Sequence, residues 1–209
     1  MGLDQGLAEL GATGIELPLA AGEMLARYLV LLAKWNRIYN LTAIREPERM
    51  VTHHVLDSLA VLPHLARRDE LRLIDIGSGG GVPGIPLAIA RPSWRVTLND
   101  SNAKKGAFLR QAVSELGLDN AEVAITRIED YAPEAKFDVV ISRAFSDLGT
   151  FAACGRRLLA PDGRLMAMKG VYPEEELREL PPDVRLAGAS ALRVPGLDAQ
   201  RHLIALEAA

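Results

Sequence analysis

Cysteine is nearly absent from this chain, which has one, Cys154, among its 209 residues. A single cysteine excludes an internal disulfide, and such cysteine usage is typical of a reducing compartment, so we expect a cytoplasmic protein. Cys154 stands in an apolar helical stretch, which favours a buried and unreactive thiol.

Long apolar runs and an excess of positive charge are also missing. No uncharged apolar stretch approaches the length of a membrane span, and residues 1–6 carry no basic segment, so we expect neither a membrane partner nor a secretory signal. The formal net charge is −3. Because nucleic-acid-binding domains are commonly basic, this balance by itself does not favour a nucleic-acid partner.

From about residue 70 onward, short apolar runs alternate with helical patterns. A helix is predicted over 103–116, with Gly117 suited to its C-cap. Strands alternating with helices predict an α/β fold in which a parallel sheet is covered on both faces. A short turn at 195–198 joins the last two runs and predicts a hairpin, with one antiparallel strand at the far end of the sheet. The seven predicted strands are 71–76, 94–99, 121–126, 137–142, 164–168, 184–192 and 201–206.

Residues 1–66 have a different pattern and predict a helical extension packed on a sheet domain of residues 67–209. Two helical stretches, about 18–39 and 46–65, surround a short link. Aromatic and amide side chains gather between Trp35 and Asn40, where they could stack on or pair with a nucleic-acid base. The alternative is that this helix end docks on the sheet and its amides cap the next turn.

The stretch from Leu73 to Gly84 is the most informative part of the chain. An apolar strand ends there in a glycine-rich loop, which opens directly into a predicted helix over 83–90. Glycine lacks a Cβ and tolerates positive φ, so a ligand can lie against bare backbone, and the helix start offers free N–H groups. The loop therefore predicts a cofactor site at the carboxyl end of a strand.

Two cofactors fit this loop. Residues 79–84 satisfy the dinucleotide motif G-x-G-x-x-G, but that motif normally begins directly after the strand, here at Gly77, and from Gly77 its third glycine is not in place. The S-adenosylmethionine pattern D-x-G-x-G-x-G is matched at every position by Asp75, Gly77, Gly79 and Gly81. Asp100, 23 positions after Gly77, closes the next strand and suits the ribose of either cofactor. The glycine spacing and the terminal hairpin favour the methyl donor, and an NAD-dependent oxidoreductase is the alternative of another class.

Eight segments carry a resemblance to a known family: 35–42, 54–58, 82–86, 100–101, 127–129, 141–145, 169–170 and 201–203. Taken in this order, they resemble the RsmG (GidB) family of bacterial ribosomal RNA small subunit methyltransferases. The resemblance implies a class I S-adenosylmethionine-dependent methyltransferase fold, Rossmann-like, with seven strands of which the last is antiparallel. It implies methyl transfer to N7 of a guanine in 16S ribosomal RNA, with naked RNA or the small ribosomal subunit as partner, and we expect a monomer. A methyltransferase of a small molecule or protein is the alternative.

The resemblance also implies roles for individual residues. Gly77 and Val82 would contact the methionine part of the donor, and Asp100 would hold its ribose. Gly79 and Arg143 would also bind the donor. Ile128 and Glu129 would border the adenine. Arg143 would lie where donor and target meet and would position the substrate; the alternative for Arg143 is a salt bridge to Asp138 or Asp100. Candidate RNA contacts are Asn40, His54, Lys169 and Arg201, with plain surface charge as the alternative for the last two.

The implied chemistry needs no acid or base residue. Guanine N7 is a lone-pair acceptor without a proton, so alignment of the reactants suffices. We expect no metal, because His53, His54 and Asp57 have too few partners nearby and fit a hydrogen-bonding network better. Two positions depart from the pattern of the RsmG family. Gly80 stands where a proline is expected in many relatives. Asn99 stands where an apolar residue is expected, and it puts an amide with no evident partner on a strand that should be buried.

Overall fold

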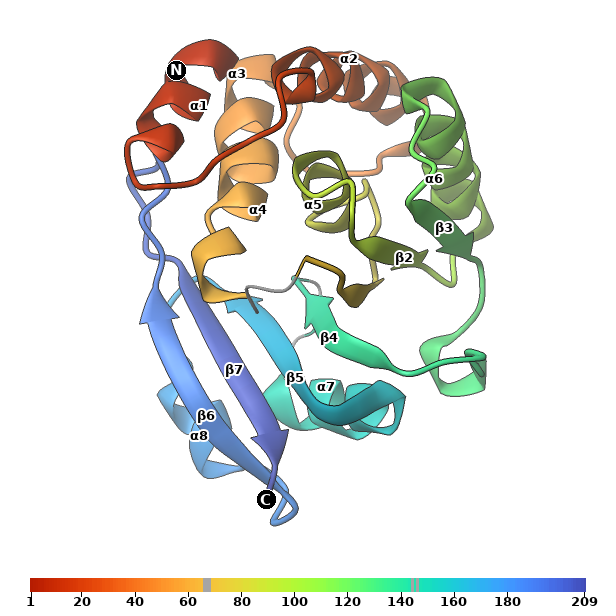
Figure 1. Ribbon diagram of the computed structural model, residues 1–209, viewed down its shortest axis with the longest axis vertical. Helices are drawn as coiled ribbons and strands as arrows, with labels where there is room; N and C mark the ends of the chain where they lie inside the picture. Colours follow the sequence, from red (N-terminus) through yellow and green to blue (C-terminus); the bar gives the residue numbers. More distant parts are fainter. Residues whose placement is uncertain (66–68, 144, 146) are drawn as a thin grey trace.

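The computed structural model describes residues 1–65, 69–143, 145 and 147–209. The boundary expected between residues 66 and 67 lies outside them. The described residues form one sheet with helices on both faces (Figure 1). None of the helices in these ranges combines the length and the apolar character needed to cross a bilayer.

Seven strands make up the sheet, in the spatial order β3-β2-β1-β4-β5-β7-β6. Neighbours from β3 through β5 are parallel, whereas β7 runs antiparallel to both β5 and β6. The hairpin and the antiparallel strand are confirmed, with one refinement: β7 lies between β5 and β6, so β6 forms the edge. The strands are β1 Arg72–Ile76, β2 Arg95–Asn99, β3 Ala121–Ala124, β4 Phe137–Ser142, β5 Leu159–Lys169, β6 Val184–Ala191 and β7 His202–Ala208.

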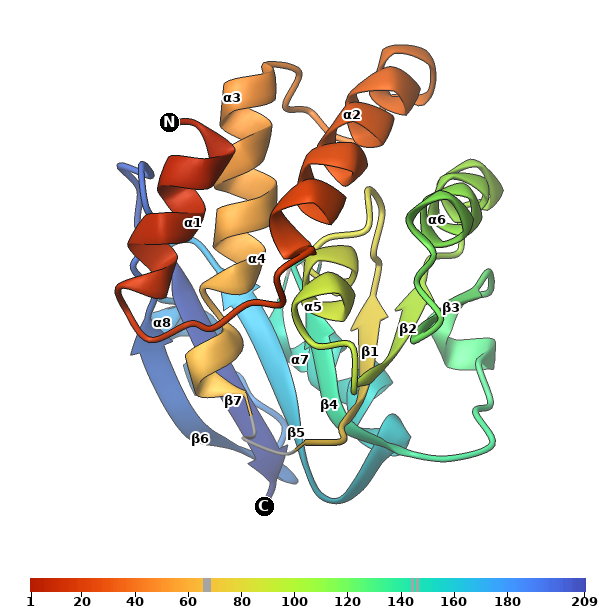
Figure 2. The same ribbon diagram turned by 45° about the horizontal axis from the view of Figure 1, so that its top comes forward.

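One face of the sheet carries most of the helices, including the whole N-terminal extension, and the other carries α7 and α8 (Figure 2). Short helical turns complete the chain. The α-helices are α1 Leu3–Gly11, α2 Ala21–Tyr39, α3 Pro47–Met50, α4 Asp57–Leu59, α5 Gly84–Ala90, α6 Ala103–Leu116, α7 Leu148–Gly155 and α8 Glu174–Arg178. The π-helical turn η1 spans Val51–Leu56, and the 3-10 turns are η2 Leu62–His64, η3 Ile128–Asp130 and η4 Arg156–Leu158.

Helix α2 places its apolar residues on one face, because Leu25, Tyr28 and Leu32 recur at spacings of three and four. It ends where Asn40 adopts a left-handed conformation, with φ of 49°. Helix α6 begins at Asn102, whose side chain accepts hydrogen bonds from two amides of the first turn, and ends as predicted at Gly117.

The extension departs from prediction in two ways. Helix α1 was not expected, and it packs so closely that a Cβ on Gly6 would lie 2.4 Å from Leu56 Cδ1. The helix predicted over 46–65 is a composite of α3, η1, α4 and η2. One apolar cluster joins the extension to α5, α6 and the sheet, so extension and sheet domain share a core.

Candidate functional site

The loop after β1 has the backbone that its glycines predict. Gly77, Gly79 and Gly81 adopt φ of 73°, 55° and 84°, a region that residues with a Cβ rarely occupy. The amides of Gly77 and Ser78 both donate to the Asn99 carbonyl at 2.9 Å, which ties the loop to the end of β2.

Asp75 lies fully buried beneath this loop. Its Oδ2 accepts a hydrogen bond from the Gly84 amide at 2.9 Å, at the start of α5. Its Oδ1 has no hydrogen-bond partner among the described residues. Burial raises the pKa of Asp75 to about 6. Gly84 must be glycine, because a Cβ there would lie 2.2 Å from Leu98 Cδ2.

Asp100 stands beside the loop, at the end of β2. Its carboxylate accepts the Gly79 amide at 2.9 Å and the Asn102 amide at 2.8 Å. The structure thus brings the acid and the glycine loop together, and the contact of Asp100 with a ribose stays a prediction. Asn99 finds the partners that its sequence left open, since its amide nitrogen donates to the carbonyls of Ala124 and Thr126 at 3.1 and 3.0 Å.

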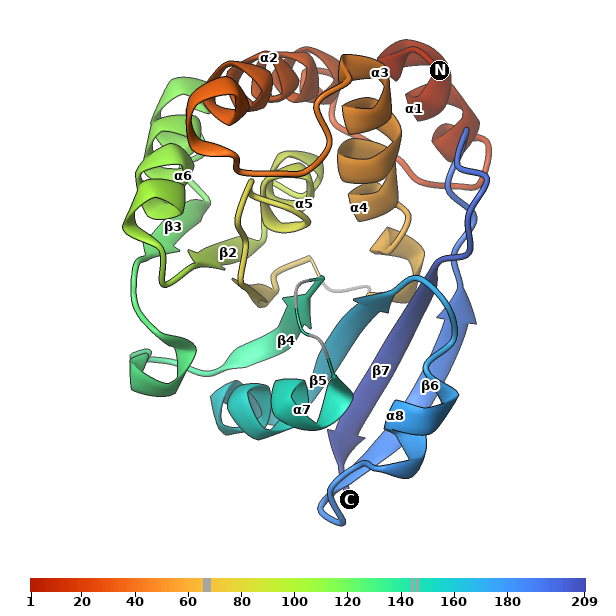
Figure 3. The same cartoon turned by 180° about the vertical axis from the view of Figure 1, so that it is seen from behind.

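A cavity of about 260 Å³ opens over the glycine loop. One wall comes from the extension and the other from the sheet domain. The link between α2 and α3 runs on the same side of the molecule as the loop between β1 and α5 (Figure 3). The cavity brings together Gly77, Gly79, Val82, His54 and Arg143, and their contacts with a donor or a substrate stay predictions. Its remaining lining residues are Leu32, Leu41, Thr42, Ser78, Gly80 and Lys105.

Arg143, just after β4, is held by the extension. Its guanidinium donates to the His53 carbonyl at 2.6 Å and to Asp57 Oδ2 at 3.4 Å, and it lies 3.3 Å from His54 Nδ1. The predicted alternative was a salt bridge from Arg143 to Asp138 or Asp100. It is wrong, because the carboxylate that pairs with Arg143 is Asp57. Asp57 also accepts from Arg201 Nε at 3.2 Å, so one buried carboxylate joins both arginines.

His54 is buried and engaged at both ring nitrogens. Its Nε2 lies 3.0 Å from Thr42 Oγ1, and Nδ1 faces Arg143. Burial, helped by the charge of Arg143, lowers the pKa of His54 to about 3. The ring is therefore neutral, with Nδ1 free to accept from Arg143 and Nε2–H donating to Thr42. Within the described ranges, no group of His, Cys, Asp and Glu is arranged to hold a metal ion.

Two predicted adenine contacts lie apart from this cavity in the structure. Ile128 and Glu129 fall on η3, and neither lines the cavity. The Ile128 carbonyl accepts from Arg157, and the Glu129 carboxylate lies 3.8 Å from Cys154 Sγ. Their role stays a prediction. Cys154 is half-buried, which corrects the expectation of full burial, because its helix α7 turns it toward the surface turn that carries Glu129.

The four candidate RNA contacts occupy different settings. His54 lines the cavity, whereas Arg201 does not line it and is paired to Asp57. Lys169 Nζ donates to both oxygens of Glu176 at 3.0 and 2.7 Å, so it is not plain surface charge. Asn40 accepts from Arg45 at 3.1 Å. Their contact with RNA stays a prediction.

The aromatic and amide cluster at the end of α2 docks on the protein itself. Asn36 donates to the Ile44 carbonyl at 3.1 Å and accepts from the Thr42 amide at 2.8 Å, so it shapes the link that reaches the cavity. Trp35 packs edge-on against Phe108 of α6, with ring centroids 5.7 Å apart. The helix-docking interpretation is therefore the one that the structure supports.

Sequence reasoning missed three residues of the site. Thr42 and Lys105 line the cavity, and Tyr28 donates its hydroxyl to the Gly80 carbonyl at 2.5 Å. The apolar spacing of α2 indicates that Tyr28 points inward, but no local pattern reveals what its hydroxyl meets, because the partner lies 52 residues away.

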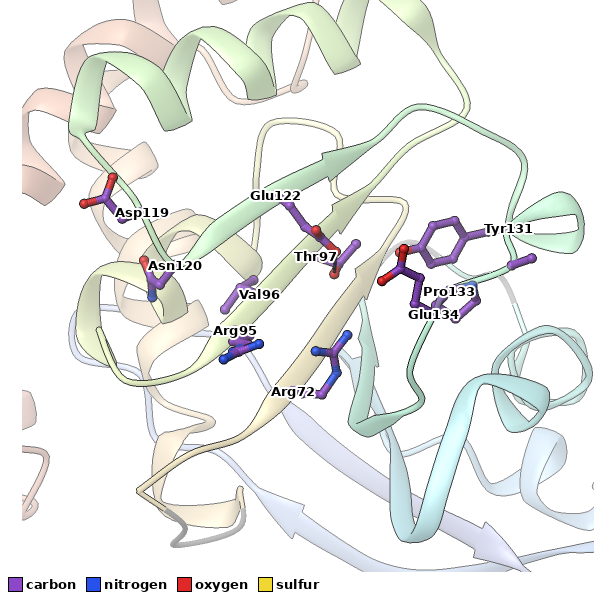
Figure 4. Close-up of a pocket in the computed structure, with 11 residues that line it drawn as sticks. Arg72, Arg95, Val96, Thr97, Asp119, Asn120, Glu122, Tyr131, Pro133 and Glu134 are labelled. Carbon is purple, nitrogen blue, oxygen red and sulfur yellow. Dashed lines mark hydrogen bonds between the residues drawn. The ribbon is translucent and has the colours of Figure 1, made fainter.

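A larger cavity, of about 680 Å³, lies at the other end of the strands (Figure 4). Arg72 and Arg95, the first residues of β1 and β2, line it together with Thr97, Glu122 and Tyr131. Cofactors of open parallel sheets bind at the carboxyl ends of the strands, so this cavity is not the cofactor site.

Comparison with known proteins decides the family. Residues 21–204 match the model of the GidB family, rRNA small subunit methyltransferase G. The chain belongs to this family. It is 55% identical to the ribosomal RNA small subunit methyltransferase G of Laribacter hongkongensis, over 98% of this chain and 96% of the relative. It is 56% identical to the protein of the same name from Chromobacterium violaceum, over 97% and 94%.

Solved structures show the same fold. A SAM-dependent methyltransferase from Aquifex aeolicus superimposes with a TM-score of 0.62 at 17% identity, covering 84% of this chain and 97% of that one. The glycopeptide N-methyltransferase MtfA, in complex with S-adenosylhomocysteine, gives 0.61 at 11% identity, over 74% and 86%. The class I methyltransferase fold is thereby confirmed. Membership of a methyltransferase family supports S-adenosylmethionine as the cofactor, and the NAD alternative is set aside.

The residues present fit this cofactor. The three positive-φ glycines form a cradle that side chains would obstruct, and Asp75 beneath it keeps one buried oxygen without a partner. The carboxylate of Asp100, at the end of β2, suits the ribose that the donor carries. The backbone from Gly77 to Val82 and the carboxylate of Asp100 would hold it.

Proposed function

We propose that this chain transfers a methyl group from S-adenosylmethionine to N7 of a guanine in 16S ribosomal RNA. Family membership supports the ribosomal substrate, since the named relatives are ribosomal RNA small subunit methyltransferases. The observation that carries the choice of a ring nitrogen is the state of His54. Besides Arg143, two of the described residues that line the cavity have a basic side chain, His54 and Lys105. Both ring nitrogens of His54 are already engaged, and Lys105 Nζ lies 3.9 Å from Asp100 Oδ2.

A site without a free base suits an acceptor without a proton. Guanine N7 has a lone pair and no hydrogen, so nothing must be removed before or after attack. An exocyclic amine or a hydroxyl would lose a proton during transfer and would need a group to take it. Catalysis here is then a matter of proximity and alignment.

The cofactor supplies an electrophilic methyl group on a positively charged sulfur. The backbone of the loop from Gly77 to Val82 would hold the donor at the carboxyl end of β1, and Asp100 would fix its ribose. Arg143, which lines the same cavity at the end of β4, orients the incoming base. It does so through O6 or a neighbouring phosphate, because a hydrogen bond to N7 would occupy the lone pair that must react.

The N-terminal extension completes the site. It contributes Leu41, Thr42 and His54 to the cavity wall. Through Asp57 it also fixes Arg143, whose guanidinium would otherwise be free to turn away. A ribosomal RNA substrate further implies a cytoplasmic enzyme, and the expected monomeric state stays a prediction.

The test is transfer of tritium from labelled S-adenosylmethionine to RNA. Two substrates are offered: naked 16S RNA, and small ribosomal subunits from cells that lack the modification. Labelled RNA that is cleaved at one guanine after borohydride reduction and aniline treatment supports N7 of that guanine. Label in RNA without such cleavage would move the target to another atom, and label in protein or small molecules alone would contradict the proposal.

A further inference from the structure

We propose that Tyr28 is a positioning residue for the methyl-donor loop, and that α2 therefore belongs to the donor site. The inference rests on donor binding by this loop and goes beyond it, because Tyr28 does not line the cavity and lies on the extension. It concerns how the loop acquires its shape before the donor arrives.

The first observation is a hydrogen bond at the least constrained point of the loop. Tyr28, fully buried, donates its hydroxyl to the Gly80 carbonyl at 2.5 Å. The other side of the same peptide is also held, because the Gly81 amide donates to the Ser78 carbonyl at 2.7 Å. The Gly80–Gly81 peptide plane is thus fixed from both sides, and only one of these contacts comes from outside the loop.

The second observation is that α2 touches this segment twice. Leu32, one helical turn after Tyr28, lies so near that a Cβ on Gly80 would be 3.1 Å from its Cδ1. Leu32 lines the cavity together with Gly80. A polar and an apolar contact from one rigid helix therefore meet the same residue, which sets the loop against the cavity wall.

Three consecutive glycines explain why such support is needed. Gly79, Gly80 and Gly81 have the greatest conformational freedom of any tripeptide and lose the most entropy on ordering. If the loop becomes ordered only when the donor binds, the entropy lost on ordering lowers the affinity for the donor. A loop that is already ordered in the free protein avoids this loss. Burial also raises the pKa of Tyr28, so the phenol stays protonated and remains a donor.

The experiment removes the hydroxyl alone. In Tyr28→Phe we expect the Kd for S-adenosylhomocysteine, measured by calorimetry, to rise about fivefold or more, and KM for the methyl donor to rise with it. We expect kcat at saturating donor to change less than twofold, because the bound loop has its normal shape. The matched control is Tyr131→Phe, which removes a hydroxyl at the distant cavity of Figure 4. This substitution should leave Kd and KM unchanged.

Amide hydrogen exchange provides a second measurement that a general loss of stability would not reproduce. Amides of residues 79–82 should exchange faster in Tyr28→Phe than in wild type, while those of α6 should not. If Tyr28→Phe fails to fold, Leu32→Val trims the other α2 contact and should weaken donor binding in the same direction.

The outcomes separate the two proposals. Wild-type affinity and wild-type loop exchange in Tyr28→Phe would overturn the role of Tyr28 and leave the donor site intact. Absence of S-adenosylhomocysteine binding in the wild type would overturn the donor site itself. A fall in kcat with unchanged KM would also contradict positioning of the donor.

Discussion

Arg143 and Asp57 are 86 residues apart in the sequence, and their side chains meet at 3.4 Å beside the donor loop. Asp57 belongs to the extension and Arg143 to the end of β4, so this ion pair joins the two parts of the site. The Asp57 side chain is 1% exposed and also accepts from Arg201. One buried carboxylate thus pairs with two guanidinium groups.

Removing the charge of Asp57 should release both arginines. Asp57→Asn keeps the shape of the side chain but leaves two partly buried cations without their anion. We expect the free energy of unfolding to fall by about 1–3 kcal/mol, below the full value for a buried pair because Arg143 and Arg201 are 28% and 22% exposed. The rate of methyl transfer at saturating donor should fall about tenfold or more, because a displaced Arg143 no longer orients the base for transfer.

Glu207 provides the matched control for Asp57. It also pairs with two arginines, Arg164 and Arg185, but at the outer end of the sheet. Urea unfolding and methyl transfer should both be close to wild type in Glu207→Gln. Equal effects of the two substitutions would mean that the Asp57 pair has no special link to the site.

Arg143→Ala should separate catalysis from donor binding. Arg143 lines the cavity, so its loss removes the group that orients the base while the donor loop stays intact. We expect methyl transfer to fall about 10- to 100-fold and the Kd for S-adenosylhomocysteine to change less than threefold. Arg185→Ala, at an exposed pair, controls for loss of a cation. A larger effect on donor affinity than on transfer would place Arg143 in the donor pocket.

Asp100→Ala should weaken donor binding by two routes. The carboxylate is expected to bind the ribose, and it also accepts the Gly79 amide at 2.9 Å, so its loss removes a ligand contact and a support of the loop. A charge-assisted hydrogen bond contributes about 1.5–3 kcal/mol, which corresponds to a Kd raised about 10- to 100-fold. Calorimetry with S-adenosylhomocysteine measures this, with exposed Asp130→Ala as control. An unchanged Kd would show that the ribose is held elsewhere.

The sheet and the donor loop could be predicted because their signals are local. Strand β4 matches its prediction at both ends, and Gly77, Gly79 and Gly81 have the positive φ that their spacing implies. Partners across the chain could not be predicted in this way. The alternative role for Arg143 was a salt bridge to Asp138 or Asp100, yet its partner is Asp57. The partner depends on how the extension packs, and no local pattern encodes that packing.

The helical extension shows the same limit. Helix α1 was missed because its nine residues contain two glycines, and its stability comes from packing of residues such as Leu10 rather than from propensity. Asn99 looked unsatisfied because its acceptors, the carbonyls of Ala124 and Thr126, belong to a neighbouring strand and the loop beyond it.

Lys169 and Glu176 allow a test between a structural and an RNA-binding role. Glu176 also accepts the Leu148 amide at 2.8 Å, so the pair joins the end of β5 to the starts of α7 and α8. We expect Lys169→Ala and Glu176→Gln to lower the free energy of unfolding by similar amounts, about 1–2 kcal/mol. If Lys169 also contacts RNA, affinity for 16S RNA, measured by filter binding, should fall only in Lys169→Ala. A fall in both variants would assign Lys169 to structure alone.

His54 should make stability depend on pH in a defined direction. Its pKa is about 3 in the folded protein against about 6.5 when unfolded, so between these values the unfolded state binds the extra proton and acid destabilises the fold. At pH 5 the free energy of unfolding should be about 2 kcal/mol lower than at pH 7.5 because of His54.

Asp75 acts in the opposite direction, because its pKa is raised to about 6 and acid protonates the folded state first. The measurement is therefore the difference between wild type and His54→Gln in urea unfolding at both pH values, with His53→Gln as control for loss of an imidazole. If the wild type and His54→Gln lose the same stability on acidification, His54 is not the neutral, buried group on which the orientation of Arg143 depends.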